Sequence, residues 1–148
     1  MSERPTLDDF GYFHELPTRW SDCDMLGHIN NARYFTFDES ARLAYFDELI
    51  GGSGEFWKRS GFILARIECD FIAQVHHPAH VKFGFRVRRI GRSSMNTEGG
   101  MFVDGQLVAV TRGVLVWFDY ERNRSAPVPD DARAYIRNRE KIPPDESA

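Results

Sequence analysis

The stretch SDCDMLGHINNARYFTF, from Ser21 to Phe37, joins a polar loop to what looks like the start of a buried helix. Two aspartates, Asp22 and Asp24, flank a cysteine, and a Gly-His pair and two asparagines follow. Aspartate and asparagine favour turns and helix N-termini, because their side chains bind backbone N–H groups that have no other partner. The stretch therefore marks a turn that leads into a helix, and its carboxylates are candidates either for capping or for chemistry.

A helix is expected directly after this turn, from about Asn31 to Leu49. Alanine, arginine, glutamate and leucine are frequent in this range, and no glycine or proline interrupts it. Its apolar residues cover much of its circumference, so the helix is expected to be buried on most sides. Gly51 and Gly52 suit the left-handed backbone that commonly ends a helix.

The second half of the chain alternates apolar and polar residues in the manner of β-strands. Strands are expected at 62–75, 81–87, 95–103 and 107–120, and an earlier one is expected between Tyr12 and Trp20, interrupted or bounded by Pro17. Asp104 and Gly105 are a strong signal for a two-residue hairpin turn. The order is therefore one strand, one long helix and then four long antiparallel strands.

These elements fit one α+β domain over residues 1–148, with its core at about residues 12–120. A helix that is apolar on all sides cannot lie on a flat sheet with its back to water. A curved antiparallel sheet wrapped around a long central helix solves this problem, and a short C-terminal helix follows at about 131–140, capped by Asp130 or Asp131. The edge strand of such a sheet stays free, so edge pairing is expected to give a homodimer or a homotetramer.

The composition excludes several classes of protein. With 42% hydrophobic and 14% aromatic residues, the chain is too apolar to be disordered. A net charge of −3 gives no attraction to nucleic acid, and no apolar run is long enough to cross a membrane. The N-terminal residues lack the features of a signal peptide, so a cytoplasmic location is expected. Two cysteines, Cys23 and Cys69, are too few for a disulfide framework.

Two patterns suggest metal sites, but their spacing does not fit. The spacing of acids and glycine in 22–27 resembles the start of a calcium loop, yet its next ligand position is Leu26 and its closing position is Arg33 instead of glutamate. The histidines of 76–80 lie close in sequence, but Pro78 prevents the helical spacing that would aim two of them at one ion. No metal and no other cofactor is therefore expected.

The chain resembles a known family in this region and beyond it. The match rests on Arg19, the Asp22-Cys23-Asp24 triplet, Gly27-His28-Ile29-Asn30-Asn31, Tyr34 and Glu39-Ser40-Ala41-Arg42. These motifs resemble those of the hotdog-fold thioesterases, specifically the 4-hydroxybenzoyl-CoA thioesterase-like family of acyl-CoA thioesterases. The resemblance extends through IGRSS (90–94) and the final hairpin, so it covers about residues 12–120.

The resemblance implies a thioesterase site with no cofactor. Asp24 matches the aspartate that serves as nucleophile or general base in the family. The helix start near Asn31 matches the backbone N–H that binds the thioester carbonyl. The resemblance also implies that Glu39 assists Asp24, and we expect Tyr34 to contact the substrate. A carboxylate beside a helix N-terminus suits this chemistry, because the free N–H groups carry partial positive charge for the developing oxyanion.

Each of these residues has a structural alternative. Judged by spacing alone, Asp24 is a turn or cap residue, and Asp22 is expected to form a turn or a salt bridge with Arg19. His28 either orients substrate and takes part in proton transfer or holds the loop by hydrogen bonds. Asn30 and Asn31 are natural caps. Glu39 has the alternative of a buried ion pair with an arginine, and Cys23 is expected to be a small packing residue.

The only marked basic cluster lies between residues 86 and 94. The expected contacts to the phosphates of CoA in this cluster are Arg88, Arg89, Arg92, Ser93 and Ser94. A solvated strand face is the alternative. The sequence thus predicts a thioesterase that hydrolyses acyl-CoA to free acid and CoA. A non-catalytic acyl-CoA sensor on the same fold stays open, since a fold does not determine a function. A hydratase or dehydratase is a third possibility, without a feature that favours it.

Overall fold

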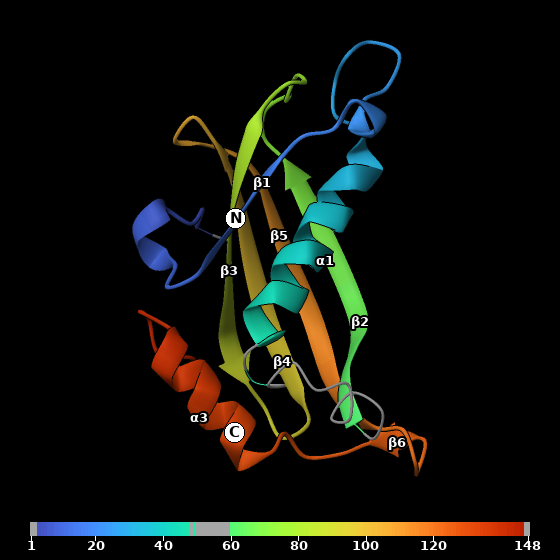
Figure 1. The fold of residues 1–148 in the computed structure, drawn as a ribbon. Helices are drawn as coiled ribbons and strands as arrows, with labels where there is room; N and C mark the ends of the chain where they lie inside the picture. Colours follow the sequence, from blue (N-terminus) through green and yellow to red (C-terminus); the bar gives the residue numbers. More distant parts are fainter. Residues whose placement is uncertain (1–2, 48, 50–59, 147–148) are drawn as a thin grey trace.

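The computed structural model describes residues 3–47, 49 and 60–146 (Figure 1). The regular elements are β1 (Phe13–Pro17), α1 (Asn31–Asp47), β2 (Ser60–Phe71), β3 (His80–Ile90), β4 (Ser94–Val103), β5 (Gln106–Asp119), β6 (Arg124–Ser125) and α3 (Asp130–Arg139). Short 3₁₀ helices, η1 (Leu7–Asp9) and η2 (Trp20–Asp22), lie before and after β1. The expected end of the long helix at Gly51 and Gly52 lies outside the described residues.

The strands form one antiparallel sheet in the order β1-β3-β4-β5-β2, and β6 adds to β5. The sheet is curved, and α1 lies across its concave face (Figure 1). The turn between β4 and β5 is the expected hairpin, in which Asp104 and Gly105 have φ angles of 52° and 77°. Two positive φ angles match the right-handed twist of the flanking strands. The expected α+β class with a curved sheet and a long helix is confirmed.

The core lies between α1 and the odd-numbered residues of β3 and β5. Its largest members include Phe37, Tyr45, Phe46, Phe83, Phe85, Met95, Met101, Leu115 and Trp117. The packed core reaches beyond residues 12–120. Val128, Ala132 and Ile136 close it from the C-terminal side, and Phe10 is buried on the opposite face of the sheet, where Gly84 and Gly100 leave space for its ring.

The expectation that α1 is buried on most sides is wrong for a single chain. One face of the helix packs on the sheet, but Glu39 is exposed and 55% of Leu43 is accessible to solvent. The adjacent strand β2 bonds only to β5, so its other edge is free within the described residues. Exposed apolar residues on that strand include Ile63, Leu64 and Phe71. The sheet wraps one side of α1 and leaves the side beside β2 uncovered.

Several elements differ in length from the expected ones. The strand expected at 62–75 ends at Phe71, although the apolar alternation continues. The N–H groups of Ile72 and Ala73 still donate to the carbonyl of Val108 in β5. After Ala73 the chain pairs with the loop before α1, where the N–H of Ile29 donates to the carbonyl of Val75 at 2.8 Å. The alternation therefore reports an extended chain whose partner changes. The first strand, β1, ends at Pro17, the expected boundary, and η2 follows from Trp20. Helix α3 begins at Asp130 with Pro129 as its N-cap, so the expected aspartate caps lie in its first turn.

Candidate active site

The loop that carries Asp24 is a closed hairpin between η2 and α1. The backbones of Cys23 and Ile29 form a β-bridge, and the N–H of Asp24 donates to the carbonyl of His28 at 2.8 Å. The tip turns at Gly27, whose φ of 79° is costly for residues with a side chain. A second bridge joins His28 to His76, so the loop is tied to the segment that follows β2.

The Asp24 side chain stabilises this loop and is also exposed at its surface. Its Oδ1 accepts the backbone N–H groups of Leu26 at 2.9 Å and of His28 at 3.2 Å. It does not cap α1, because that place is taken by Asn30, whose Oδ1 accepts the N–H of Ala32 at 2.9 Å. Of the structural alternatives for Asp24, the structure therefore shows a turn and excludes a helix cap.

The N-terminus of α1 opens next to Asp24. The N–H of Arg33 donates to the carbonyl of Asn30 at 2.9 Å, and the Asn30 side chain occupies the N–H of Ala32. The N–H of Asn31 has no acceptor among the described residues. A free donor in the first turn, with the partial positive charge of the helix end, is suited to bind an oxyanion.

A pocket of about 210 Å³ brings four of the predicted site residues together. Asp24, His28, Asn31 and Tyr34 form one side, and 71–75 form the other. Asp24 also borders a wider hollow of about 730 Å³ on the other side of its loop, with Trp20, Cys23 and His77 among the lining residues. The carboxylate thus stands between two open spaces.

Tyr34 is a buried wall of the smaller pocket. Its ring meets that of Phe71 edge-on, with centroids 5.0 Å apart, and burial raises the pKa of its hydroxyl. Burial likewise raises the pKa of the nearby Cys69 thiol to about 12, so this cysteine is protonated and unreactive near neutral pH. Tyr34 thus lines the same pocket as Asp24, His28 and Asn31.

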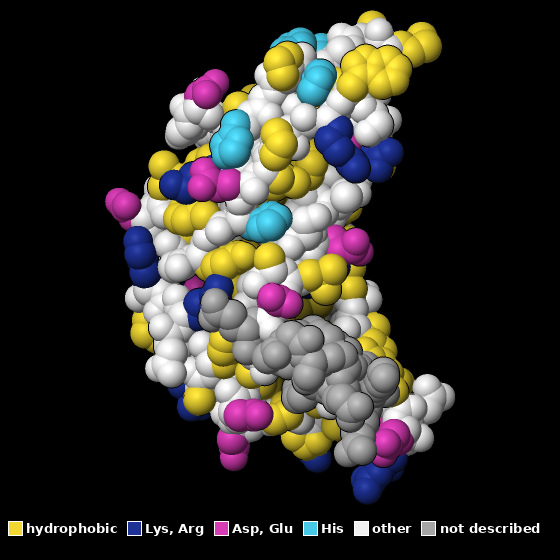
Figure 2. Space-filling model, viewed as in Figure 1, with side chains coloured by type: hydrophobic (Ala, Val, Ile, Leu, Met, Phe, Trp, Pro, Cys, Tyr) yellow, Lys and Arg dark blue, Asp and Glu magenta, His cyan; other side chains and the backbone are white. Residues whose placement is uncertain are grey.

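The histidines near the site turn to different partners. The rings of His28 and His76 meet edge-on with centroids 4.6 Å apart. His77 Nδ1 lies 2.8 Å from the hydroxyl of Thr18, and His80 Nε2 lies 3.3 Å from a carboxylate oxygen of Glu15. Figure 2 shows histidines gathered in the upper half of this face. Among the described residues, no three His, Cys, Asp or Glu side chains are arranged to hold a metal ion.

Glu39 does not reach this pocket. It lies two turns along α1, its side chain is 62% exposed, and it borders a separate hollow between α1 and β2. The proposed buried ion pair is also wrong for this residue, since its contact with Arg42 is long, at 3.9 Å. The acid in that role is Asp38, which was missed. Asp38 binds Arg42 Nη1 at 2.7 Å and accepts the hydroxyl of Thr111 at 2.6 Å.

Sequence spacing contains a signal for Asp38. Asp38 and Arg42 are four residues apart, a spacing at which opposite charges meet on a helix. Burial raises the pKa of the Asp38 carboxyl, against the effects of Thr111 and Arg42. Asp38 therefore belongs to the packing between α1 and β5.

Asp22 forms the ion pair with Arg19 that the sequence predicts. Arg19 Nη2 lies 3.0 Å from its Oδ1, and the Arg19 N–H donates to its Oδ2 at 2.8 Å. Only 1% of the Asp22 side chain is exposed, and burial by itself would raise the pKa of its carboxyl group. The hydrogen bonds from Arg19, with the charges of Arg19 and Arg33, outweigh burial and lower this pKa.

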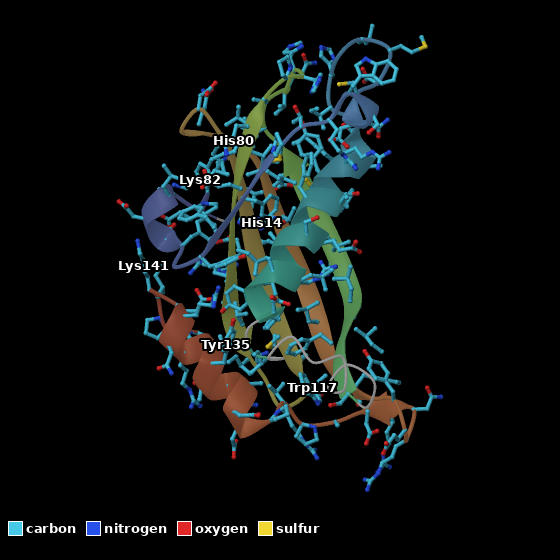
Figure 3. All side chains as sticks on the ribbon, viewed as in Figure 1. His14, His80, Lys82, Trp117, Tyr135 and Lys141 are labelled. Carbon is cyan, nitrogen blue, oxygen red and sulfur yellow. The ribbon has the colours of Figure 1, made fainter. Side chains whose placement is uncertain are left out.

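The predicted CoA contacts lie at the other end of the sheet. β3 begins beside the loop of Asp24, and Arg88 is eight residues beyond His80, which is about 26 Å along an extended strand. Ser93 bonds through its carbonyl to the N–H of Trp117 at 2.7 Å, and Figure 3 shows His80 and Trp117 at opposite ends. Arg88, Arg89, Arg92, Ser93 and Ser94 are therefore not joined to Asp24 within one chain.

Comparisons with known proteins agree with this geometry. The family model described as the thioesterase-like superfamily matches residues 18–136. The uncharacterized protein YsmA of Bacillus subtilis is 30% identical over 108 residues, which are 68% of this chain and 72% of YsmA. None of the helices in the described part of the chain has the length and apolar character needed to cross a membrane.

Solved structures extend the similarity to the whole fold. A thioesterase from Thermus thermophilus, complexed with coenzyme A and Zn, is 34% identical with a TM-score of 0.79 and covers 93% of this chain and 100% of its own. The PA5185 protein of Pseudomonas aeruginosa is 30% identical with a TM-score of 0.82, covering 93% of this chain and 97% of its own. The chain therefore belongs to the thioesterase-like superfamily and has the hotdog fold of these enzymes.

Proposed function

We propose that this protein hydrolyses acyl-CoA thioesters to the free acid and CoA, with Asp24 as its catalytic carboxylate. Membership of the superfamily supports thioester hydrolysis in general. The coenzyme A bound to the similar Thermus thermophilus protein supports a CoA ester as substrate. The observation that carries the proposal is the pocket that Asp24 and Asn31 both line at the start of α1, where the N–H of Asn31 has no acceptor among the described residues.

Two routes fit this pair of groups. In the first, the Asp24 carboxylate takes a proton from water while the oxygen of that water attacks the thioester carbon. In the second, Asp24 attacks the carbon itself, and water then hydrolyses the resulting mixed anhydride. In both, the N–H of Asn31 stabilises the oxyanion, and the C–S bond breaks to release CoA, whose thiolate takes up the proton. His28 borders the same pocket and would orient the substrate or relay the proton.

The proposed enzyme is a dimer with its sites at the boundary between copies. The uncovered side of α1 and the free edge of β2 together expose Leu43, Ile63, Leu64 and Phe71. Figure 2 shows hydrophobic side chains on this face. Antiparallel pairing of two β2 edges would cover them and place the 88–94 end of one copy beside the Asp24 end of the other. Such pairing would bring the two groups of predicted site residues together.

A thiol-release assay tests the proposed function directly. Purified protein is given a panel of aliphatic and aromatic acyl-CoA esters, and free CoA thiol is measured over time. We expect turnover on at least one ester and its loss in Asp24→Asn. An absence of turnover across the panel, with the esters still bound, would favour the second candidate, a non-catalytic acyl-CoA sensor.

One observation favours that second candidate. Asp24 Oδ1 already accepts two backbone N–H groups, so this aspartate has a structural role that needs no chemistry. A sensor would use the same pocket for recognition only. Calorimetric titration with a non-hydrolysable acyl-CoA analogue, run beside the thiol-release assay, separates the two functions. Both an enzyme and a sensor bind the analogue, but only an enzyme releases thiol from the corresponding ester.

A further inference from the structure

Asp22 touches both ends of the loop that carries Asp24. At the entrance of the loop its carboxylate binds the backbone N–H and the guanidinium of Arg19 at 2.8 and 3.0 Å. At the exit its carbonyl accepts the N–H of Asn30, the cap of α1, at 2.9 Å. Its Oδ1 also lies 3.8 Å from Nε of Arg33, in the first turn of the helix. One buried residue thus joins the chain before the loop to the helix after it.

This arrangement controls a distance that matters for hydrolysis. Asp24 lies on the loop, whereas the N–H of Asn31 lies on the helix, and both must face one carbonyl group. Small errors in such a placement are costly for a positioned catalytic group. The loop itself is short and polar, and its tip residues Met25 and Leu26 are exposed, so packing of the tip contributes little to its position.

We infer that Asp22 is a positioning residue, which sets Asp24 relative to the N-terminus of α1 through its contacts with Arg19 and Arg33. This inference rests on the proposed function, because it assigns a role in the same site. The carboxylate needs both oxygens for this task. Oδ2 accepts an N–H of the backbone, and Oδ1 faces two guanidinium groups. An asparagine has one acceptor oxygen, so its NH₂ group would have to face a donor.

The first experiment compares Asp22→Asn, Arg33→Gln and the double variant in the thiol-release assay. We expect kcat to fall about tenfold in Asp22→Asn, with KM within about twofold of the original. Arg33→Gln should lower kcat by a smaller factor. The double variant should be no slower than Asp22→Asn, because both substitutions remove the same contact and their effects on kcat therefore do not add.

Glu98→Gln is the matched control for loss of a buried acid. Glu98 is also buried and paired with arginines, at 3.0 Å from Arg86 and 3.1 Å from Arg112, but it lies in the middle of β4, away from the loop. This variant should unfold at lower urea concentration and keep its kcat. If Asp22→Asn also keeps its kcat at a similar loss of stability, Asp22 is a structural residue only and the inference is wrong.

A second measurement needs no turnover and separates this inference from the proposed function. The amide protons of Leu26 and His28 are bound by Asp24, so their hydrogen exchange reports on the loop. We expect Asp22→Asn to speed the exchange of these two amides by about tenfold or more. Glu98→Gln should speed it no more than its loss of global stability accounts for. If the original protein has no thioesterase activity but Asp22→Asn still speeds this exchange, the proposed hydrolysis is refuted and the role of Asp22 in positioning the loop stands. Unchanged exchange in Asp22→Asn would refute the positioning role, whatever the activity.

Discussion

The two ends of α1 are built in opposite ways. At the N-terminal end, polar residues cap the helix, and the Asp24 carboxylate is exposed beside a free N–H. At the C-terminal end, Tyr45 is fully buried, and its hydroxyl donates to Oε2 of Glu140 at 2.5 Å. The same oxygen accepts the N–H of Val87 at 2.9 Å, so α1, β3 and the residue after α3 meet at one carboxylate.

Aromatic side chains pack around Tyr45 at the C-terminal end of the described helix. The rings of Tyr12 and Tyr45 meet edge-on at 5.6 Å, and the guanidinium of Arg139 lies 4.4 Å from the Tyr12 ring. The Tyr135 hydroxyl donates to the carbonyl of Tyr45 at 2.6 Å, and Figure 3 shows this tyrosine on α3 facing the sheet. One end of the helix is therefore fixed by packing, which leaves the other end free to present donors to a ligand. Changes at the two ends should affect different properties.

The largest effect is expected at the N-terminal end of α1, beside Asp24. Asp24→Asn keeps the size and the acceptor oxygen that binds the loop amides, but it removes the anionic base or nucleophile. We expect kcat to fall by roughly 10²–10⁴-fold, the usual contribution of a positioned acid–base group, while folding and assembly stay normal. Steady-state thiol release measures the change. Turnover close to that of the unchanged protein would mean that the catalytic carboxylate lies elsewhere.

A charge on the uncovered side of α1, between its two ends, should break the assembly. Leu43→Glu keeps a good helix former but puts a carboxylate into the proposed contact between copies. We expect the protein to become a monomer at micromolar concentration and its KM for acyl-CoA to rise by about tenfold, because each site would lose the partner's arginines.

Light scattering with size-exclusion chromatography measures this change. Ile142→Glu is the control, since it puts the same charge on an exposed residue of the C-terminal tail. A stable monomer in the unchanged protein would contradict the proposed dimer outright.

A change at the C-terminal end of α1 should cost stability and spare catalysis. Tyr45→Phe removes the hydroxyl that Glu140 accepts and leaves a buried carboxyl group with one partner fewer. The free energy of unfolding should fall by about 1–3 kcal/mol, the usual cost of an unmade buried hydrogen bond. Urea unfolding measures it, and kcat per folded molecule should be unchanged. A large fall in kcat would show that the two ends of α1 are coupled.

The arginines near the C-terminal end of α1 should act on binding alone. Replacing Arg88, Arg89 and Arg92 together by glutamine should raise KM for acyl-CoA by about tenfold and leave kcat nearly intact, because the phosphates lie far from the reacting carbon. Added salt should raise KM in the original protein and have less effect on the triple variant. An unchanged KM would assign these side chains to a solvated surface.

The smallest effect is expected in the dependence of stability on pH. Burial raises the pKa of Glu140 above its ordinary 4.5, so the folded protein binds this proton more tightly than the unfolded chain does. Its contribution to stability is therefore fully present below about pH 4.5 and is lost as pH rises through the raised pKa. Glu140→Gln should remove this loss. Asp22 has the opposite sign, because its lowered pKa makes its contribution disappear in acid.

Urea unfolding of the original protein, Glu140→Gln and Asp22→Asn between about pH 3 and 7 tests both signs. As pH rises, the free energy of unfolding of the original protein should fall relative to that of Glu140→Gln. As pH falls, the free energy of unfolding of the original protein should approach that of Asp22→Asn. Parallel curves for all three proteins would mean that neither carboxyl titrates differently in the folded state.

Local sequence determined the elements of this protein and its loop. Asparagine at position 30 caps α1, Asp104 and Gly105 turn a hairpin, and alternation marks four strands, because each signal depends on neighbours along the chain. The motif from Asp22 to Tyr34 also identified one side of the pocket, since a turn followed directly by a helix places these residues close together without any long-range contact.

Only the tertiary structure decided which acid is buried and which residues share a site. Asp38 and Glu39 are adjacent, yet packing against Thr111 of β5 buries the first and leaves the second in solvent. Alternation up to Val75 could not reveal that the chain changes its partner after Ala73, since extended backbone looks the same in either pairing. The arginines of β3 lie far from Asp24 because a strand rises steadily along its length, a separation that no local pattern records.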